Sequence, residues 1–135
     1  MSKILLVCAK ADFGPRLQTA LEEARAFVGE GHTVVDPASL DWAAVQRAEG
    51  GWDAGYRWAA RAHDACIVLE TPGGALARGT FEIAQNFMKL EKRVGVLRDG
   101  KVVRVEALQK SLAADWKLDY GRALPAIPVS DDELR

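Results

Sequence analysis

The chain has 135 residues and a formal net charge of −1, from 18 basic and 19 acidic side chains. This length is typical of a single domain, and the balanced charge argues against a general nucleic-acid-binding protein, which would carry a basic excess. Apolar residues make up 49% of the chain but form no segment long enough to cross a membrane, which is the pattern of a soluble globular protein.

The first residues, MSKILLVCAK, contain an apolar run that is too short for the core of a signal peptide. We therefore expect a cytoplasmic protein. Both cysteines, Cys8 and Cys66, lie in apolar runs, and in that compartment they are expected to be buried thiols rather than a disulfide. His32 and His63 stand alone in the sequence, so no metal site is predicted.

Short apolar runs alternate with segments of helical periodicity. Pro15 suits the first turn of a helix and Gly29 or Gly31 its end, while Asp99–Gly100 is a strong turn signal that predicts a strand pairing back or extending the sheet edge. The expected elements in chain order are a strand at 3–8, a helix from 15, a strand at 32–37, helices at 39–48 and 52–62, a strand at 64–69, a helix at 79–91, strands at 93–98 and 101–105, a helix at 106–113 and a further strand at 115–120.

This alternation predicts an α/β fold, a three-layer sandwich with a mainly parallel five-stranded sheet. Residues 1–121 are expected to form one domain. Residues 122–135, with three of the five prolines and an acidic end, are expected to be an extended or disordered tail. Ligands of such sheets bind beyond the carboxyl ends of the strands, which selects two loops, residues 9–15 and the glycine-rich segment that begins at residue 70.

The glycine-rich segment ETPGGALARGTFEIAQ, residues 70–85, is neither a Walker loop nor the dinucleotide fingerprint. Glycines allow backbone N–H groups to approach a ligand, and the helix start that follows favours an anion. Such a loop can equally be only a connection. If it binds a phosphate, Lys10 after the first strand and Arg78 within the loop are the candidate cations; Arg16 is interpreted as surface charge.

Glu82 allows two interpretations. With Gly79 as the N-cap of the helix, Glu82 stands at the third helical position, where a capping-box acid stabilises a helix start. Alternatively its carboxylate points into the cleft and acts as a nucleophile or base on a sugar. Trp52 and Tyr56 lie four residues apart on one helix face and either stack on a base or pack in the core or a dimer contact.

The run RAHDACIVLETPGGALARGTFEIAQNFMKLEKRVGVL, residues 61–97, resembles the core of the nucleoside 2-deoxyribosyltransferase family, which includes hydrolases of nucleoside 5′-monophosphates. Asp64 opening a buried strand, Gly79, Glu82 and the strand from Arg93 match the family pattern in order, and GHTVVDP resembles its second strand. The resemblance, over roughly residues 3–105, implies a flavodoxin-like fold, a homo-oligomer and Glu82 as the nucleophile that attacks C1 of the sugar.

The sequence also departs from that family. Leu6 stands where members often carry a tyrosine that orients the glutamate, Tyr56 where they carry an aspartate, and Leu76 where many carry a loop acid. Asp53, one turn before Tyr56, can substitute for the missing aspartate. The site is either rebuilt with Asp53, Tyr56 and Arg78, or it binds nucleotides without turning them over.

We therefore predict hydrolysis or base exchange at the N-glycosidic bond of a nucleoside or nucleoside 5′-monophosphate. The alternatives are an inactive nucleotide-binding or sensing module of the same fold and a structural oligomeric domain without a ligand. No metal or organic cofactor, nucleic acid or membrane partner is implied. The apolar residues Phe81, Phe87 and Met88 of one helix, together with the tryptophan-rich helix at 52–62, predict exposed apolar faces that become a homo-oligomer interface. The candidate catalytic residues are Glu82 and Asp53, and the candidate substrate-binding residues are Cys8, Ala9, Lys10, Tyr56, Gly73, Gly74, Arg78 and Gly79.

Overall fold

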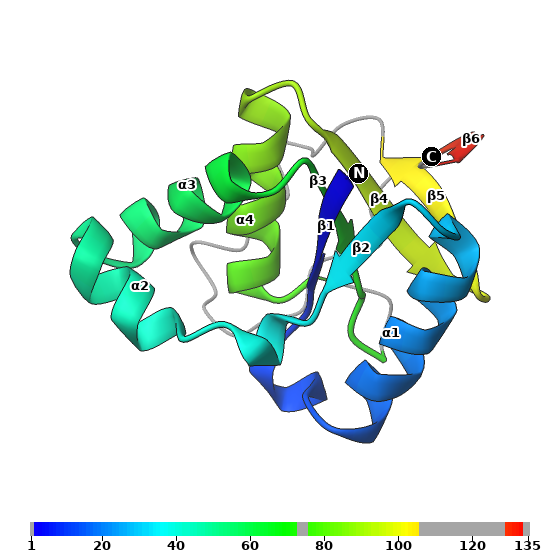
Figure 1. The fold of residues 1–135 in the computed structure, drawn as a ribbon, viewed down its shortest axis with the longest axis horizontal. Coiled ribbons are helices and arrows are strands. Elements are labelled where there is room, and N and C mark those ends of the chain that lie inside the picture. The colour runs from blue at the N-terminus through cyan, green and yellow to red at the C-terminus, as the bar shows by residue number, and fades with distance from the viewer. Residues whose placement is uncertain (1, 73–75, 106–128, 134–135) are drawn as a thin grey trace.

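The computed structural model describes residues 2–72, 76–105 and 129–133 (Figure 1). The helices and strands follow the sequence expectations closely up to residue 105. In chain order they are β1 Ser2–Val7, a 3-10 turn Lys10–Asp12, α1 Pro15–Val28, β2 His32–Val35, a 3-10 turn Pro37–Ser39, α2 Trp42–Glu49, α3 Trp52–Ala62, β3 Ala65–Val68, α4 Arg78–Lys89, β4 Arg93–Arg98, β5 Lys101–Val105 and β6 Val129–Glu133.

Local signals explain most of the element boundaries. Pro15 occupies the first turn of α1, and the Asp41 side chain caps α2 by accepting a hydrogen bond of 3.0 Å from the Ala44 amide. Gly50 and Gly51 separate α2 from α3, with φ angles of 97° and 125° that L side chains rarely adopt. The two short helices therefore meet at a sharp corner rather than forming one long helix.

The sheet has six strands in the order β2-β1-β3-β4-β5-β6. The first four are parallel, whereas β5 runs antiparallel to β4, and β6 runs antiparallel to β5. The α/β class is confirmed, but the expectation of a mainly parallel five-stranded sheet is wrong, because the sheet is mixed. The reversal follows from Asp99 and Gly100, whose φ angles of 52° and 73° are both positive, as a tight hairpin turn requires.

Helices cover both faces of the sheet. Along β1, Ile4 and Leu6 pack with α1 on one face, while Leu5 and Val7 pack with α3 and α4 on the other. This double burial explains why β1 is a continuous apolar run rather than an alternating one. Figure 1 shows α1 on one side of the sheet and α3 and α4 on the other.

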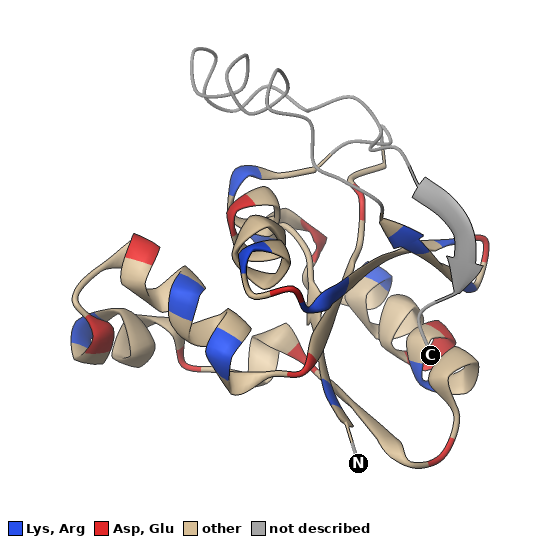
Figure 2. Cartoon of the chain, turned by 90° about the horizontal axis from the view of Figure 1, so that it is seen from above, with Lys and Arg blue, Asp and Glu red and all other residues tan. Residues whose placement is uncertain are grey.

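Several expectations concern residues that the structure does not describe. The predicted helix at 106–113, the strand at 115–120 and the domain boundary at 121 all lie outside the described residues. Within the predicted tail, Val129–Glu133 forms β6. None of the helices in the described ranges has the length and apolar character to cross a bilayer, and acidic and basic residues are interspersed over the described chain (Figure 2).

Two further sequence expectations can be compared directly. Cys8 and Cys66 are free, as predicted. The large residues of α4 do not form the exposed face from which we predicted an oligomer: Phe81 and Phe87 are fully buried in the core, and Met88 packs against it. These residues leave no apolar face because α3 and β4 already cover them.

Candidate functional site

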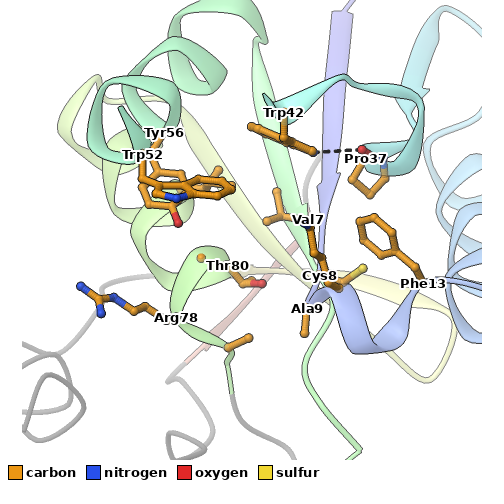
Figure 3. Close-up of a pocket in the computed structure, with 14 residues that line it drawn as sticks. Val7, Cys8, Ala9, Phe13, Pro37, Trp42, Trp52, Tyr56, Arg78 and Thr80 are labelled. Carbon is orange, nitrogen blue, oxygen red and sulfur yellow. Dashed lines mark hydrogen bonds between the residues drawn. The ribbon is translucent and has the colours of Figure 1, made fainter. Parts of the chain in front are cut away.

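The parallel strands reverse their order of connection between β1 and β3. The chain leaves β1 for β2 through α1 on one face and leaves β3 for β4 through α4 on the other. A crevice at the carboxyl ends of two such strands is the usual ligand site of an open α/β sheet. A pocket of about 330 Å³ occupies this position (Figure 3) and is called here the switch pocket.

One wall of the switch pocket is aromatic. Trp52 and Tyr56, one turn apart on α3, have ring centroids separated by 6.0 Å and planes inclined by 33°. Trp42 lines the opposite part of the wall, where its indole N–H donates a hydrogen bond of 3.0 Å to the Pro37 carbonyl. The fixed indole and the tilted Trp52–Tyr56 pair form surfaces against which a planar ligand can pack.

The charged residues in the described lining of the pocket are all basic. Its described lining contains Lys10 and Arg78 but no aspartate or glutamate. Both cations are exposed to solvent, so they lie at the mouth rather than at the floor. The floor includes Val7 from β1 and Ile83 from α4, and the combination suits a ligand with an apolar planar body and an anionic group at the mouth.

The candidate substrate-binding residues are largely brought together. Cys8, Ala9, Lys10, Tyr56, Arg78 and Gly79 all line the switch pocket. Gly73 and Gly74 lie outside the described residues. Burial raises the pKa of the Cys8 thiol to about 12, so at neutral pH this thiol is protonated and contacts a ligand by packing rather than by thiolate chemistry.

The two candidate catalytic acids lie beside the switch pocket rather than in its lining. Glu82 and Asp53 line an adjoining depression, also about 330 Å³, which we call the acidic depression. Three residues, Trp52, Tyr56 and Arg78, line both spaces. A ligand whose body lies in the switch pocket must therefore extend past this shared wall to reach either carboxylate.

The helix start differs from the capping-box interpretation. Ala77, not Gly79, is the N-cap of α4, and no side chain caps it. Glu82 is consequently the fifth residue of the helix, two residues beyond the position from which an acid can cap the start. A Cβ atom at Gly79 would lie 3.5 Å from the Tyr56 hydroxyl oxygen, which is an ordinary van der Waals distance, so this position does not require a glycine.

A partly buried charge network was missed by sequence reasoning. Glu70, at the start of the glycine-rich segment, accepts two hydrogen bonds from Arg98, of 2.6 and 2.9 Å. Arg16 donates a bond of 2.6 Å to the Glu70 carbonyl and pairs with Asp12 at 3.0 Å. Arg16, interpreted from the sequence as surface charge, thus ties the loop after β1 to the loop after β3. The available signal was an acid directly after the apolar run of β3.

Thr80 was also missed, although it stands in the helix start that drew attention to Glu82. It is the third residue of α4, is 2% exposed and lines the switch pocket. Its position two residues before Glu82 gave no sequence signal, because a threonine in the first helical turn is common.

Two positions that were compared with the family pattern lie away from the pocket. Asp64 precedes β3 at the amino edge of the sheet, where its carboxylate accepts a bond of 2.8 Å from the Lys3 amide. Leu6 packs on the α1 face of the sheet, opposite the aromatic wall. A tyrosine at position 6 would point away from Glu82, and Val7 is the β1 residue on the pocket side.

His63 is buried, at 4% exposure. Its Nδ1 lies 2.8 Å from the Ala59 carbonyl oxygen, and its ring packs edge-to-face on Trp58. Burial lowers the pKa of His63. Among the described residues, no group of three or more histidine, cysteine, aspartate or glutamate side chains could hold a metal ion.

Comparison with known proteins leaves the sequence and the structure as the evidence for function: no family model, no curated protein and no solved structure matches this chain significantly.

Proposed function

We propose that this protein binds a nucleoside or nucleoside 5′-monophosphate in the switch pocket and cleaves its N-glycosidic bond by hydrolysis or base exchange. The proposal includes the resemblance of residues 61–97 to nucleoside 2-deoxyribosyltransferases and a flavodoxin-like arrangement of the sheet. The strand order β2-β1-β3-β4 supports that arrangement, while the antiparallel β5 is a local departure at its edge.

The observation that carries the proposal is the combination of an aromatic wall with exposed cations in one pocket at the carboxyl edge. The Trp52–Tyr56 pair supplies a surface for a purine or pyrimidine ring. Lys10 and Arg78 at the mouth supply charge for a 5′-phosphate, and the guanidinium suits phosphate because of its fork of donors.

Glu82 is the proposed nucleophile because the resemblance to nucleoside 2-deoxyribosyltransferases implies that role, and its place in the lining of the acidic depression, next to the shared wall, is compatible with it. A carboxylate oxygen of Glu82 attacks C1 of the sugar, and the bonding pair of the C1–N bond leaves with the base, which takes up a proton. Attack by water then releases the sugar and restores the carboxylate, whereas attack by a second base gives exchange. We assign the transfer of these protons to Asp53, which lines the same depression.

One observation favours the second candidate, a binding or sensing module without turnover. The two carboxylates line the acidic depression and not the switch pocket, and Tyr56 occupies the position where the family carries an aspartate. A ligand held wholly within the switch pocket would be bound without meeting Glu82.

The deciding experiment is base release from the four 2′-deoxynucleosides and their 5′-monophosphates, followed by chromatography. Wild-type protein should release base, and Glu82→Gln should lower the rate by several orders of magnitude because an amide cannot form the glycosyl ester. Binding and folding should persist in this variant, since Glu82 lies beyond the capping position of α4. Binding without any base release by the wild type would favour the sensing module.

Assembly and location form a further part of the proposal. The family resemblance implies a homo-oligomer, and Trp52, at 48% exposure, and Leu90, at 47%, are the large apolar side chains left exposed among the described residues. We propose a homo-oligomer, which sedimentation at micromolar concentration would detect, with a monomer as the contrary result. The free thiols of Cys8 and Cys66 support a cytoplasmic location.

A further inference from the structure

Thr80 is a buried polar group without a partner inside the described protein. Its side chain lines the switch pocket and is 2% exposed, and its Oγ1 atom has no hydrogen-bond partner among the residues that the structure describes. Figure 3 shows the hydroxyl oxygen directed across the pocket floor toward the end of β1 near Cys8.

Such a hydroxyl is costly to the folded protein. Removing it from water without replacing its hydrogen bond destabilises the fold, and valine would fill nearly the same volume at this position without that cost. A buried orphan polar group inside a pocket is therefore explained most simply by a partner that arrives with the ligand.

The residues around Thr80 indicate which part of a ligand would form the hydrogen bond with its hydroxyl. The pocket cations Lys10 and Arg78 are solvent-exposed, whereas Thr80 shares its floor with Val7 and Ile83. Burying a phosphate dianion against two apolar side chains and one hydroxyl would cost more than that single hydrogen bond returns. A neutral polar group avoids this cost, because one hydroxyl can satisfy it.

We propose that Thr80 is a specificity-determining residue that hydrogen-bonds a neutral group of the nucleoside part of the ligand, either a sugar hydroxyl or the edge of the base. The phosphate, where present, stays at the mouth with Lys10 and Arg78. This inference rests on the proposed ligand class but not on turnover, and it assigns the recognition of nucleoside and phosphate to different residues.

The test compares Thr80→Val with wild-type protein in binding titrations against the four 2′-deoxynucleosides and their 5′-monophosphates. The variant should lose about ten-fold in affinity for a nucleoside and for its monophosphate alike, which is the effect expected for one lost hydrogen bond to a neutral group. Thr80→Ser, which retains the hydroxyl, should bind as the wild type does. Thr19→Val, at an exposed position on α1, is the matched control and should change neither affinity.

A second measurement separates a ligand-binding role from a structural one. Without ligand, Thr80→Val should melt at a temperature at least as high as the wild type, because the variant loses an unsatisfied hydroxyl and no internal bond. A lower melting temperature combined with unchanged affinities would overturn the proposal, since it would mean that the hydroxyl serves the fold.

The remaining outcomes are also distinguishable. A loss confined to the monophosphates would overturn the proposal by placing Thr80 at the phosphate. If the effect of Thr80→Val disappears with 2′,3′-dideoxynucleosides, the partner is the sugar hydroxyl; if it persists, the partner is the base, and both results support the inference.

Binding with the expected Thr80 effect but no base release would refute the proposed turnover alone, whereas absence of binding to all eight probes would refute both.

Discussion

The Glu70–Arg98 pair provides the sharpest test of how the site is held together. We expect Arg98→Met to destabilise the protein strongly, because it leaves the Glu70 carboxylate, whose side chain is 9% exposed, without the guanidinium that binds both of its oxygens. The methionine retains the apolar stem of the arginine, so the variant removes the charge and its hydrogen bonds and little of the packing.

The expected loss of stability follows from the exposed fractions of the Glu70 and Arg98 side chains. Removing one partner of a fully buried ion pair costs about 3–5 kcal/mol. Arg98 is 32% exposed, so water reaches its side of the pair and offsets part of that loss, and we expect about 2–3 kcal/mol. Glu70→Gln/Arg98→Met should recover most of the loss, because an amide in place of the carboxylate leaves no unpaired buried charge.

Urea unfolding at neutral pH, followed by tryptophan fluorescence, measures both variants. With a denaturant dependence of about 2 kcal/mol per molar, the single variant should unfold about 1–1.5 M earlier than the wild type. A shift near zero for Arg98→Met, or a double variant no more stable than the single one, would refute the view that Glu70 depends on this guanidinium.

Two further predictions concern charge elsewhere. Burial lowers the pKa of His63 below its usual value near 6.5. The free energy of unfolding should therefore be constant above about pH 6.5 and fall below that pH by up to about 1.4 kcal/mol per pH unit. His63→Phe should flatten this decline in urea titrations between pH 5 and 7, and an unchanged decline would mean that other groups cause it. Arg78→Ala should weaken a nucleoside 5′-monophosphate about ten- to a hundredfold more than the matching nucleoside in calorimetric titrations, and equal losses would remove the phosphate role.

The elements of the fold were predictable because their signals are local. Pro15, the Gly50–Gly51 corner and Asp99–Gly100 each fix a boundary through backbone geometry that the residue itself dictates. The Asp99–Gly100 turn predicted a strand that pairs back or extends the sheet edge, and β5 does pair back, but the expectation of a mainly parallel sheet did not take this pairing into account. Strand direction depends on which neighbour a strand pairs with, and apolar periodicity carries no information about that choice.

The candidate site was predictable in its location but not in its internal arrangement. The rule that ligands bind beyond carboxyl strand ends selected the loops that carry Lys10 and Arg78, and both residues line the pocket. Glu82 lines the neighbouring depression and not the pocket because of how α4 is packed against α3, and this packing cannot be inferred from the sequence of the helix alone. Thr80 and Glu70 are of interest because their side chains are buried, and burial cannot be inferred from a short stretch of sequence.

The position of Arg78 on the shared wall bears on how a nucleotide would bind. A phosphate near Lys10 and a carboxylate at Glu82 repel one another, and Arg78 is the cation that lines both the switch pocket and the acidic depression. A nucleotide that reached Glu82 with its sugar would place Arg78 between the two negative charges, where it lowers their mutual repulsion. A nucleotide that remained in the switch pocket would use Arg78 only at its phosphate. The two proposed functions thus share the same ligand contacts at Thr80 and the aromatic wall, and they differ in whether the sugar crosses the wall formed by Trp52 and Tyr56 to meet a carboxylate.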